Sequence, residues 1–254
     1  MSAEAPRPFG SDLPPWPQTD HAAWGEVEVK PLGRIQKLTA GFLHRNWVSI
    51  PHVTHHDEAD ITDLEVWRKL HSTAERKLTL LPFLVKASVQ ALREFPHFNA
   101  SLDGGGSLVL KKYFNVGIAV DTPNGLLVPV VHNADQQSLH GLADRISALS
   151  TKAREKGLPM ADMSGGCFTI SALGALGGTA FTPIINAPEV AILGVTKSAW
   201  KPARTRDDAM VWRLMCPLSL SYDHRVINGA DAARFVTRIS ALLADPQALD
   251  APPP

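Results

Sequence analysis

The sequence predicts an α/β protein, an α+β two-layer sandwich in which a mixed β-sheet is covered by helices. Four segments place apolar residues three and four positions apart, as amphipathic helices do. Short segments rich in branched apolar residues, typical of strands, lie between them. The chain has 254 residues, of which 44% are hydrophobic and 20% are charged, and this is the composition of a globular protein.

The individual elements follow from these patterns and from the residues that end them. Predicted helices cover residues 62–76, 81–94, 138–156 and 230–244, and predicted strands cover 52–61, 108–113, 115–121, 126–131, 167–171, 190–197 and 215–222. Gly157 and Pro159 end the third helix, and Asp245 and Pro246 end the fourth. The run VAILGV is apolar on both faces, which indicates a strand in the middle of the sheet. The residues DTPNG are typical of a tight hairpin connection.

Composition along the chain divides it into an arm, one domain and a tail. Residues 1–24 are predicted to be a proline-rich linker or N-terminal arm, because prolines interrupt helix and ladder hydrogen bonds. Alternating elements without internal repeats predict a single domain over residues 25–250, followed by a tail at 251–254. Cys167 and Cys216 lie in apolar segments, so we expect buried free thiols and not a disulfide or a nucleophile.

Charge and hydropathy exclude several classes of partner. The formal net charge is zero, so the overall field gives no reason to expect nucleic acid or an anionic membrane. No stretch approaches the roughly 20 apolar residues of a membrane span, and the N-terminus has no targeting pattern, so we expect a cytoplasmic protein. His52, His55, His56 and Asp57 alternate on a predicted strand and do not converge, so no metal site is predicted.

The segment with the most chemistry surrounds His224. A predicted strand ends on Asp223-His224-Arg225, and a predicted helix begins just after Asn228-Gly229. A neutral imidazole held at such a strand end can accept a thiol proton near physiological pH. Taken alone, the pattern favours a surface histidine in a turn over a general base.

A second segment, GGCFTISALGALGG, is a predicted strand that runs into a glycine-rich loop at Ser171. Ser171 lacks a Gly-x-Ser-x-Gly frame, so the sequence does not favour a nucleophile elbow. Its hydroxyl could instead donate to a developing oxyanion, and a structural role is the alternative. No Gly-Lys-Ser or Gly-Lys-Thr follows the glycines, so the loop is not a phosphate-binding loop.

Four segments together resemble a known family. They are SYDHRVINGADAARF, GGCFTISALGALGGTAFTPIINAPEVAILGV, VDTPNGLLVPV and IPHVTHHDEADIT. The chain resembles the catalytic domain of the acyltransferases of 2-oxo acid dehydrogenase complexes, most of all the bacterial pyruvate dehydrogenase type. The likeness runs from about Gly25 to Ala248, and it implies the trimeric fold of chloramphenicol acetyltransferase.

The resemblance implies acyl transfer, with acetyl as the first choice, between a dihydrolipoyl thiol and coenzyme A, without an acyl-enzyme. His224 matches the histidine of the family's His-x-x-x-Asp-Gly motif, which is the base, and Ser171 matches the serine that steadies the tetrahedral intermediate. Asn228 stands where the motif usually has aspartate, so an ion pair with an arginine such as Arg45 would be lost. We expect activity to survive, with a backbone carbonyl orienting His224.

The resemblance also implies partners. It implies a homotrimer, possibly within a larger core, in which His224 of one chain faces Ser171 of its neighbour. The lipoyl group would come from a lipoyl domain, which nothing in this chain resembles, and the decarboxylase and dihydrolipoamide dehydrogenase would be further partners. Arg68 and Lys86 are candidates for contacts to the CoA phosphates, with a solvated or salt-bridged surface residue as the alternative.

Two other functions stay open from the sequence, and one expectation concerns the C-terminal end. An enzyme of the same fold could acetylate a small hydroxyl acceptor, although the long motifs favour the lipoyl-dependent reaction. A non-catalytic scaffold is the second, and the presence of both His224 and Ser171 argues against it. The final residues, LDAPPP, suit an apolar pocket poorly, so we expect a trimer or only weak larger assemblies.

Overall fold

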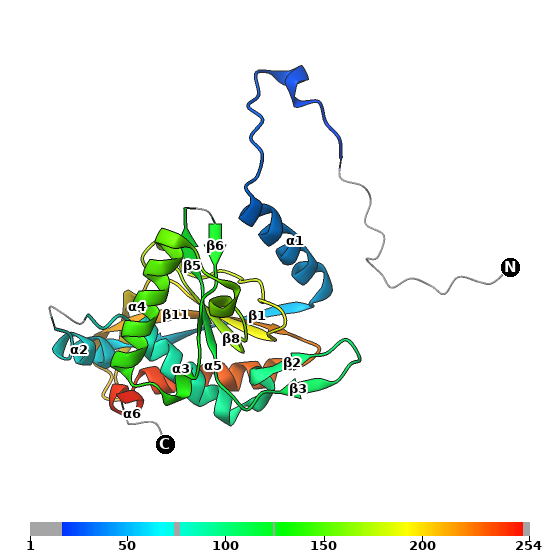
Figure 1. The fold of residues 1–254 in the computed structure, drawn as a ribbon. Helices are drawn as coiled ribbons and strands as arrows, with labels where there is room; N and C mark the ends of the chain where they lie inside the picture. Colours follow the sequence, from blue (N-terminus) through cyan, green and yellow to red (C-terminus); the bar gives the residue numbers. More distant parts are fainter. Residues whose placement is uncertain (1–16, 74–76, 124, 251–254) are drawn as a thin grey trace.

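The computed structural model describes residues 17–73, 77–123 and 125–250, and its centre is a mixed sheet (Figure 1). The main path of the sheet runs in the order β1 (His52–Asp60), β11 (Met210–Asp223), β9 (Ala191–Val195), β8 (Phe168–Ala172), β4 (Val116–Ile118) and β7 (Val130–Val131). β8 is parallel to both β9 and β4, and the other pairs are antiparallel. β10 (Ala199–Arg204) pairs with the outer part of β11, and the two strands form a ribbon.

Helices cover one face of this sheet, as the sequence predicts. α3 (Leu81–Glu94) and α5 (Gly229–Leu243) pack on each other and α5 packs on β1, while α4 (Leu139–Lys156) lies beside α3. The rings of Phe98 and Phe235 stack at 4.0 Å in the core between helices and sheet. All five residues of β9 are buried, which confirms the prediction of a central strand for VAILGV.

Two small hairpins flank the main sheet. β2 (Ala100–Leu102) pairs with β3 (Leu108–Leu110), and β5 (Val120–Thr122) pairs with β6 (Gly125–Leu127). The second pair confirms the predicted hairpin, although Asn124 in its turn lies outside the described residues. The prediction of one strand over 115–121 was wrong, because the chain leaves the main sheet after β4 and pairs with β6 instead.

The remaining short elements are α2 (Thr62–Leu70), α6 (Pro246–Asp250) and four 3-10 turns at His21–Trp24, Pro96–Asn99, Ala134–Gln136 and Met160–Met163. The helix predicted over 62–76 ends early, and residues 74–76 lie outside the described part of the chain. Nδ1 of His71 lies 2.8 Å from the Trp67 carbonyl, and the Ser72 hydroxyl donates to the Arg68 carbonyl. These side chains satisfy the last helical carbonyls, so no further turn is needed.

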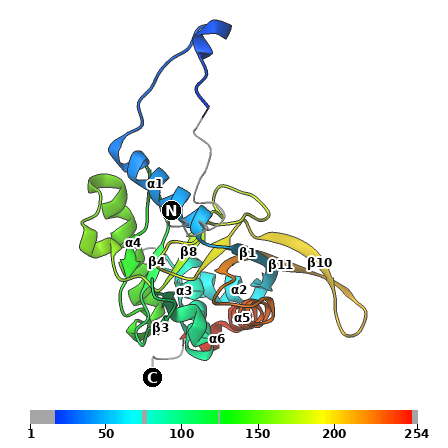
Figure 2. The same ribbon diagram turned by 90° about the vertical axis from the view of Figure 1, so that its right-hand side faces the viewer.

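α1 (Arg34–Ser49) and β10 were not predicted. Figure 2 shows α1 standing apart from the sheet, preceded by an extended exposed arm, and the β10–β11 ribbon projecting from the far side. Within α1 the only buried residue is Asn46, while Leu38, Phe42 and Trp47 are exposed. Neither element buries a full apolar face against its own chain, and burial of such a face is what sequence periodicity predicts.

The two ends of the chain are only partly described. Residues 1–16 of the predicted arm and the predicted tail, 251–254, lie outside the described residues, while 25–33 continue the exposed arm into α1. Leu249, the leucine before the tail, is fully buried against the chain's own core. It is therefore not free to enter a pocket on a neighbour.

Among the described helices, none combines the length and the apolar content that a bilayer crossing requires.

Candidate active site

His224 sits at the end of β11 with its backbone fixed and its ring free. The His224 peptide N–H donates to the Pro51 carbonyl at 3.1 Å, and the preceding Asp223 N–H donates to Val190 at 2.8 Å. The ring is exposed, with its centroid 5.9 Å from that of Tyr222. No residue in the described ranges hydrogen-bonds to the ring, so none of them supplies the backbone carbonyl that we expected to orient it.

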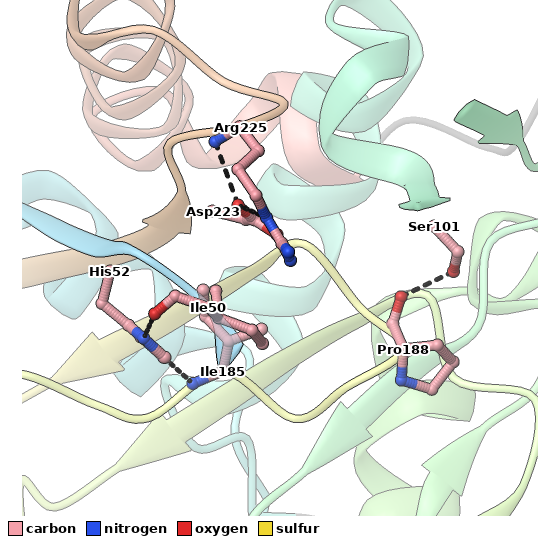
Figure 3. A network of polar contacts seen from close by, with 7 residues as sticks. All are labelled: Ile50, His52, Ser101, Ile185, Pro188, Asp223 and Arg225. Carbon is pink, nitrogen blue, oxygen red and sulfur yellow. Dashed lines mark hydrogen bonds and ion pairs between the residues drawn. The ribbon is translucent and has the colours of Figure 1, made fainter. Parts of the chain in front are cut away.

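An ion pair between the buried Asp223 carboxylate and the exposed Arg225 side chain braces the turn around His224. The Asp223 carboxylate is buried and accepts three bonds from Arg225: the peptide N–H at 3.0 Å, Nε at 2.9 Å and Nη2 at 2.6 Å (Figure 3). Val226 and Ile227 also donate their N–H groups to the Asp223 carbonyl. Charge-assisted bonds are stronger than bonds between neutral groups, so they stabilise the strand end on which His224 sits.

Asn228 starts the helix that follows and does not touch the histidine ring. Its Oδ1 accepts from the Asp231 N–H at 2.9 Å, which is the N-cap bond of α5, and its Nδ2 donates to the Asp231 carboxylate at 2.7 Å. The Arg45 guanidinium donates to Asn46 at 2.8 Å. Within one chain Asn228 is a capping residue, and its catalytic role stays a prediction.

Ser171 lies on β8 one residue before the glycine-rich loop. Its side chain is half-buried, and no hydrogen-bond partner of its hydroxyl occurs within the described chain. The loop that follows contains two glycines, Gly177 and Gly178, at φ values of 113° and 82°, which is a region that favours glycine. It then folds back, so that a Cβ at Gly194 would lie only 2.7 Å from the Phe181 ring. The predicted strand and loop at Ser171 are confirmed.

Within one protomer the two groups are far apart. Ser171 is in register with Gly194, and Gly194 with Ser219, so His224 lies five residues further along β11. At about 3.3 Å per residue and about 4.8 Å per strand, this places the backbones about 16 Å apart along the sheet and about 10 Å across it. A single protomer therefore cannot bring both side chains to one thioester.

Comparison with known proteins decides the family. The family model for the 2-oxoacid dehydrogenases acyltransferase (catalytic domain) matches residues 25–250. The chain belongs to this family. A dihydrolipoyllysine-residue acetyltransferase component of the pyruvate dehydrogenase complex from Cupriavidus necator is 56% identical over 244 residues, which are 92% of this acyltransferase domain and 42% of that protein. The domain spans about two fifths of the length of the curated relatives it matches.

Solved structures confirm the predicted fold. A structure of the Azotobacter vinelandii dihydrolipoamide acetyltransferase matches the acyltransferase domain with a TM-score of 0.90 at 53% identity, over 93% of this chain and 99% of the solved one. The cubic core of a pyruvate dehydrogenase multienzyme complex gives the same values. Chloramphenicol acetyltransferase, at 18% identity and a TM-score of 0.56 over 82% of this chain and 94% of its own, has the same fold.

Of the two CoA candidates, Arg68 is bound by other residues of the domain and Lys86 is buried. Arg68 makes a two-pronged ion pair with Glu65, at 2.6 and 2.8 Å, and donates to the Leu78 carbonyl. Lys86 is buried in α3, and this burial lowers the pKa of its ammonium group. Among the described residues, neither side chain makes a hydrogen bond or an ion pair with His224 or Ser171, so their role toward CoA stays a prediction.

The histidines of β1 make hydrogen bonds within the fold, and both cysteines are buried. The His56 ring lies 2.9 Å from the Ser219 hydroxyl, and the His52 ring lies between two backbone groups. Across the described ranges, no group of three or more His, Cys, Asp or Glu residues is placed to hold a metal ion. Cys167 and Cys216 are buried free thiols, as predicted, and burial raises the pKa of Cys216 to about 11. Such a thiol is a poor nucleophile.

Glu189 is a buried acid that the sequence did not reveal. It precedes β9, its Oε1 accepts from Asn186 at 3.3 Å, and its Oε2 has no hydrogen-bond partner in the described part of the chain. Gly166 passes so close that a Cβ there would lie 2.8 Å from Oε1. Burial raises the pKa of the Glu189 carboxyl to about 7, against the opposing effects of Thr169, Lys111 and Asn186. The acid is therefore largely neutral at mildly acidic pH.

We expect Glu189→Gln to reduce the dependence of stability on pH. The pKa of Glu189 is higher in the folded protein than in the unfolded chain. Its contribution to the stability of the folded state is therefore full below about pH 4.5 and is lost as the pH rises through about 7. Over this range the free energy of unfolding should fall by up to about 3 kcal/mol. Glutamine has the same shape and no charge, so the variant should have the higher melting temperature at pH 8 and a smaller change between pH 5 and 8. Parallel melting curves in which both proteins lose equal stability over this range would contradict the assignment.

Proposed function

We propose that this domain transfers an acetyl group between coenzyme A and a dihydrolipoyl thiol as the catalytic part of a pyruvate dehydrogenase complex. The observation that carries the proposal is that the His224 ring and the Ser171 hydroxyl sit on fixed backbone, and neither has a partner within the described chain. Membership of the acyltransferase family and the names of the bacterial relatives support the choice of reaction and of acyl group.

The reaction proceeds in one addition and one elimination. His224 takes the proton of the attacking dihydrolipoyl thiol, and the thiolate adds to the carbonyl carbon of acetyl-CoA. The carbonyl oxygen becomes an oxyanion, to which the Ser171 hydroxyl donates a hydrogen bond. The carbon–sulfur bond to CoA then breaks, and the CoA thiolate takes the proton back from His224. Ser171 never carries the acyl group.

Work on a relative supports these assignments. A structural and enzymatic study of the Azotobacter vinelandii enzyme concerns the roles of a serine, a histidine and an asparagine in its mechanism. That histidine and asparagine have the same spacing as His224 and Asn228. The asparagine at this position is therefore compatible with activity. In this domain it would act by capping α5 and fixing the turn that carries His224.

The site is completed by a second copy of the chain, in a homotrimer where His224 of one protomer meets Ser171 of the next. Their separation within one protomer supports this arrangement. Large apolar side chains of the arm and α1 are exposed in the single chain, as expected of a surface that a neighbour covers. They are Trp24, Val27, Val29, Leu32, Leu38, Phe42, Trp47 and Val48. Coenzyme A is the acyl carrier, and the lipoyl group arrives on a lipoyl domain from the decarboxylase and leaves for the dihydrolipoamide dehydrogenase.

The test is acetyl transfer from acetyl-CoA to dihydrolipoamide, followed by chromatographic quantification of acetyl-dihydrolipoamide, because substrate and product are both thioesters. We expect acetyl-CoA to be a better donor than succinyl-CoA or a branched acyl-CoA, and chloramphenicol to be a poor acceptor. Light scattering on the same sample should give three times the 27.5 kDa chain mass or a multiple of that. A monomer active with dihydrolipoamide, or a preference for chloramphenicol, would contradict the proposal.

A further inference from the structure

The ring of His52, at the start of β1, lies between a backbone carbonyl of its own segment and a backbone N–H of a segment 133 residues further along the chain. Its Nδ1 is 2.8 Å from the Ile50 carbonyl, and its Nε2 accepts from the Ile185 N–H at 2.9 Å (Figure 3). One nitrogen faces an acceptor and the other a donor, so the ring is held as the neutral tautomer with hydrogen on Nδ1. His52 therefore ties the start of β1 to the loop before β9.

The segments that His52 joins are those that hold the backbone of His224. Pro51, between Ile50 and His52, accepts the His224 N–H, and Val190, at the end of the loop that begins at Ile185, accepts the Asp223 N–H. The turn that carries His224 is thus hydrogen-bonded to two segments, at Pro51 and at Val190. The His52 ring joins the two segments through its hydrogen bonds to Ile50 and Ile185.

Two other side chains also hydrogen-bond to the backbone of the 185–190 loop. Asn46 Nδ2 donates to the Ile185 carbonyl at 2.9 Å, and the Ser101 hydroxyl donates to the Pro188 carbonyl at 2.6 Å. Ile185 also packs with Ile50 in a small buried cluster. The loop is therefore a defined structure, and His52 supplies a side-chain link from it to the strand that carries Pro51.

We propose that His52 is a positioning residue for acetyl transfer, which acts by holding Pro51 and the 185–190 loop at the separation that fixes His224. This inference rests on the proposed function, because it connects His52 to the reaction only through His224. His52 itself touches no reacting atom in this account. Catalysis is sensitive to such support, since a displacement of about 1 Å of a reacting group can cost about a hundredfold in rate.

Three variants separate positioning from simple packing. His52→Leu fills much of the space of the ring and removes both hydrogen bonds. His52→Gln retains one donor and one acceptor and can restore both. His56→Leu is the matched control, because His56 lies on the same strand, points to the same face and makes one side-chain hydrogen bond, to Ser219.

For His52→Leu we expect kcat to fall about tenfold to a hundredfold, with KM for acetyl-CoA and dihydrolipoamide changed less than about twofold. His52→Gln should recover kcat to within about threefold of the parent, and His56→Leu should stay within about twofold. Amide hydrogen exchange, read on peptides covering 185–190 and 222–228, should speed up in His52→Leu and not in His56→Leu. Wild-type kcat and exchange in His52→Leu would overturn the proposal.

The exchange measurement keeps this inference distinct from the proposed function. If His224→Ala remains active, the base assignment fails, yet faster exchange at 222–228 in His52→Leu still shows that His52 fixes the turn. If His52→Leu does not fold, His52→Gln carries the test. A folded His52→Gln protein with native exchange and near-parental kcat supports positioning, and one with native exchange and kcat reduced more than about tenfold overturns it.

Discussion

His224→Ala should abolish almost all acetyl transfer while the protein stays folded. The His224 ring is exposed and no hydrogen bond of the described residues uses it, so its removal should cost little stability. Without a base, the thiol must lose its proton to water, and general-base catalysis of this kind contributes about 10² to 10⁴ in rate. We expect kcat to fall by a factor near the upper end of that range, with KM for acetyl-CoA little changed, when the acetyl-dihydrolipoamide product is separated and quantified.

The control for this variant is His71→Ala. His71 is also an exposed histidine, stacked on Trp67 at 3.7 Å and remote from the β11 turn in sequence. It should keep parental activity. If His224→Ala retains more than about a tenth of the parental kcat, another group is the base.

Ser171→Ala should lower kcat roughly a hundredfold to a thousandfold, the usual effect of losing one oxyanion donor. Because Ser171 is not a nucleophile in this mechanism, the residual activity should proceed by the same direct transfer, with no acyl-enzyme to trap. Rapid-quench mass spectrometry of the parent with acetyl-CoA alone should therefore show no acetylated protein. Stable acetylation of Ser171 would instead establish a covalent route.

Ser171→Cys provides the matched comparison, because a thiol is close to the hydroxyl in size but is a weaker hydrogen-bond donor. Its kcat should lie at or below the parent and no lower than that of the alanine variant. A cysteine variant that becomes acetylated and turns over faster than the parent would contradict the role of Ser171 as a donor.

The parts of the fold that the sequence predicted are those with strong local patterns. α3 agrees with the prediction at both ends, and α4 and α5 to within a residue or so, because each buries an apolar stripe and has a recognisable start or stop. Ser138 and Asn228 cap α4 and α5 through their side chains. β9 was predictable from its continuous apolar run. α1 and β10 lack a buried face within one chain, so their patterns carried no such signal.

In the candidate site, too, the residues in local motifs were predicted and those defined by distant contacts were not. His224 and Ser171 were identified because they lie in local motifs that resemble a family. The hydrogen bond of His52 joins residues 133 positions apart, and the Glu189 environment depends on how Gly166 and Lys111 pack around it. No local pattern encodes such contacts. Asn228 was identified as a site residue, while its capping bond to Asp231 became visible only with the helix start in place.

The central claim is that each active site is shared between two copies of the chain. Co-expression of His224→Ala and Ser171→Ala chains with different tags, followed by tandem purification, gives mixed assemblies of two nearly inactive proteins. In a cyclic trimer that contains both variants, one of the three interfaces receives Ser171 from the first variant and His224 from the second. Purified mixed trimers should therefore show up to about a third of the parental kcat. Mixed assemblies no more active than either variant alone would contradict a shared site.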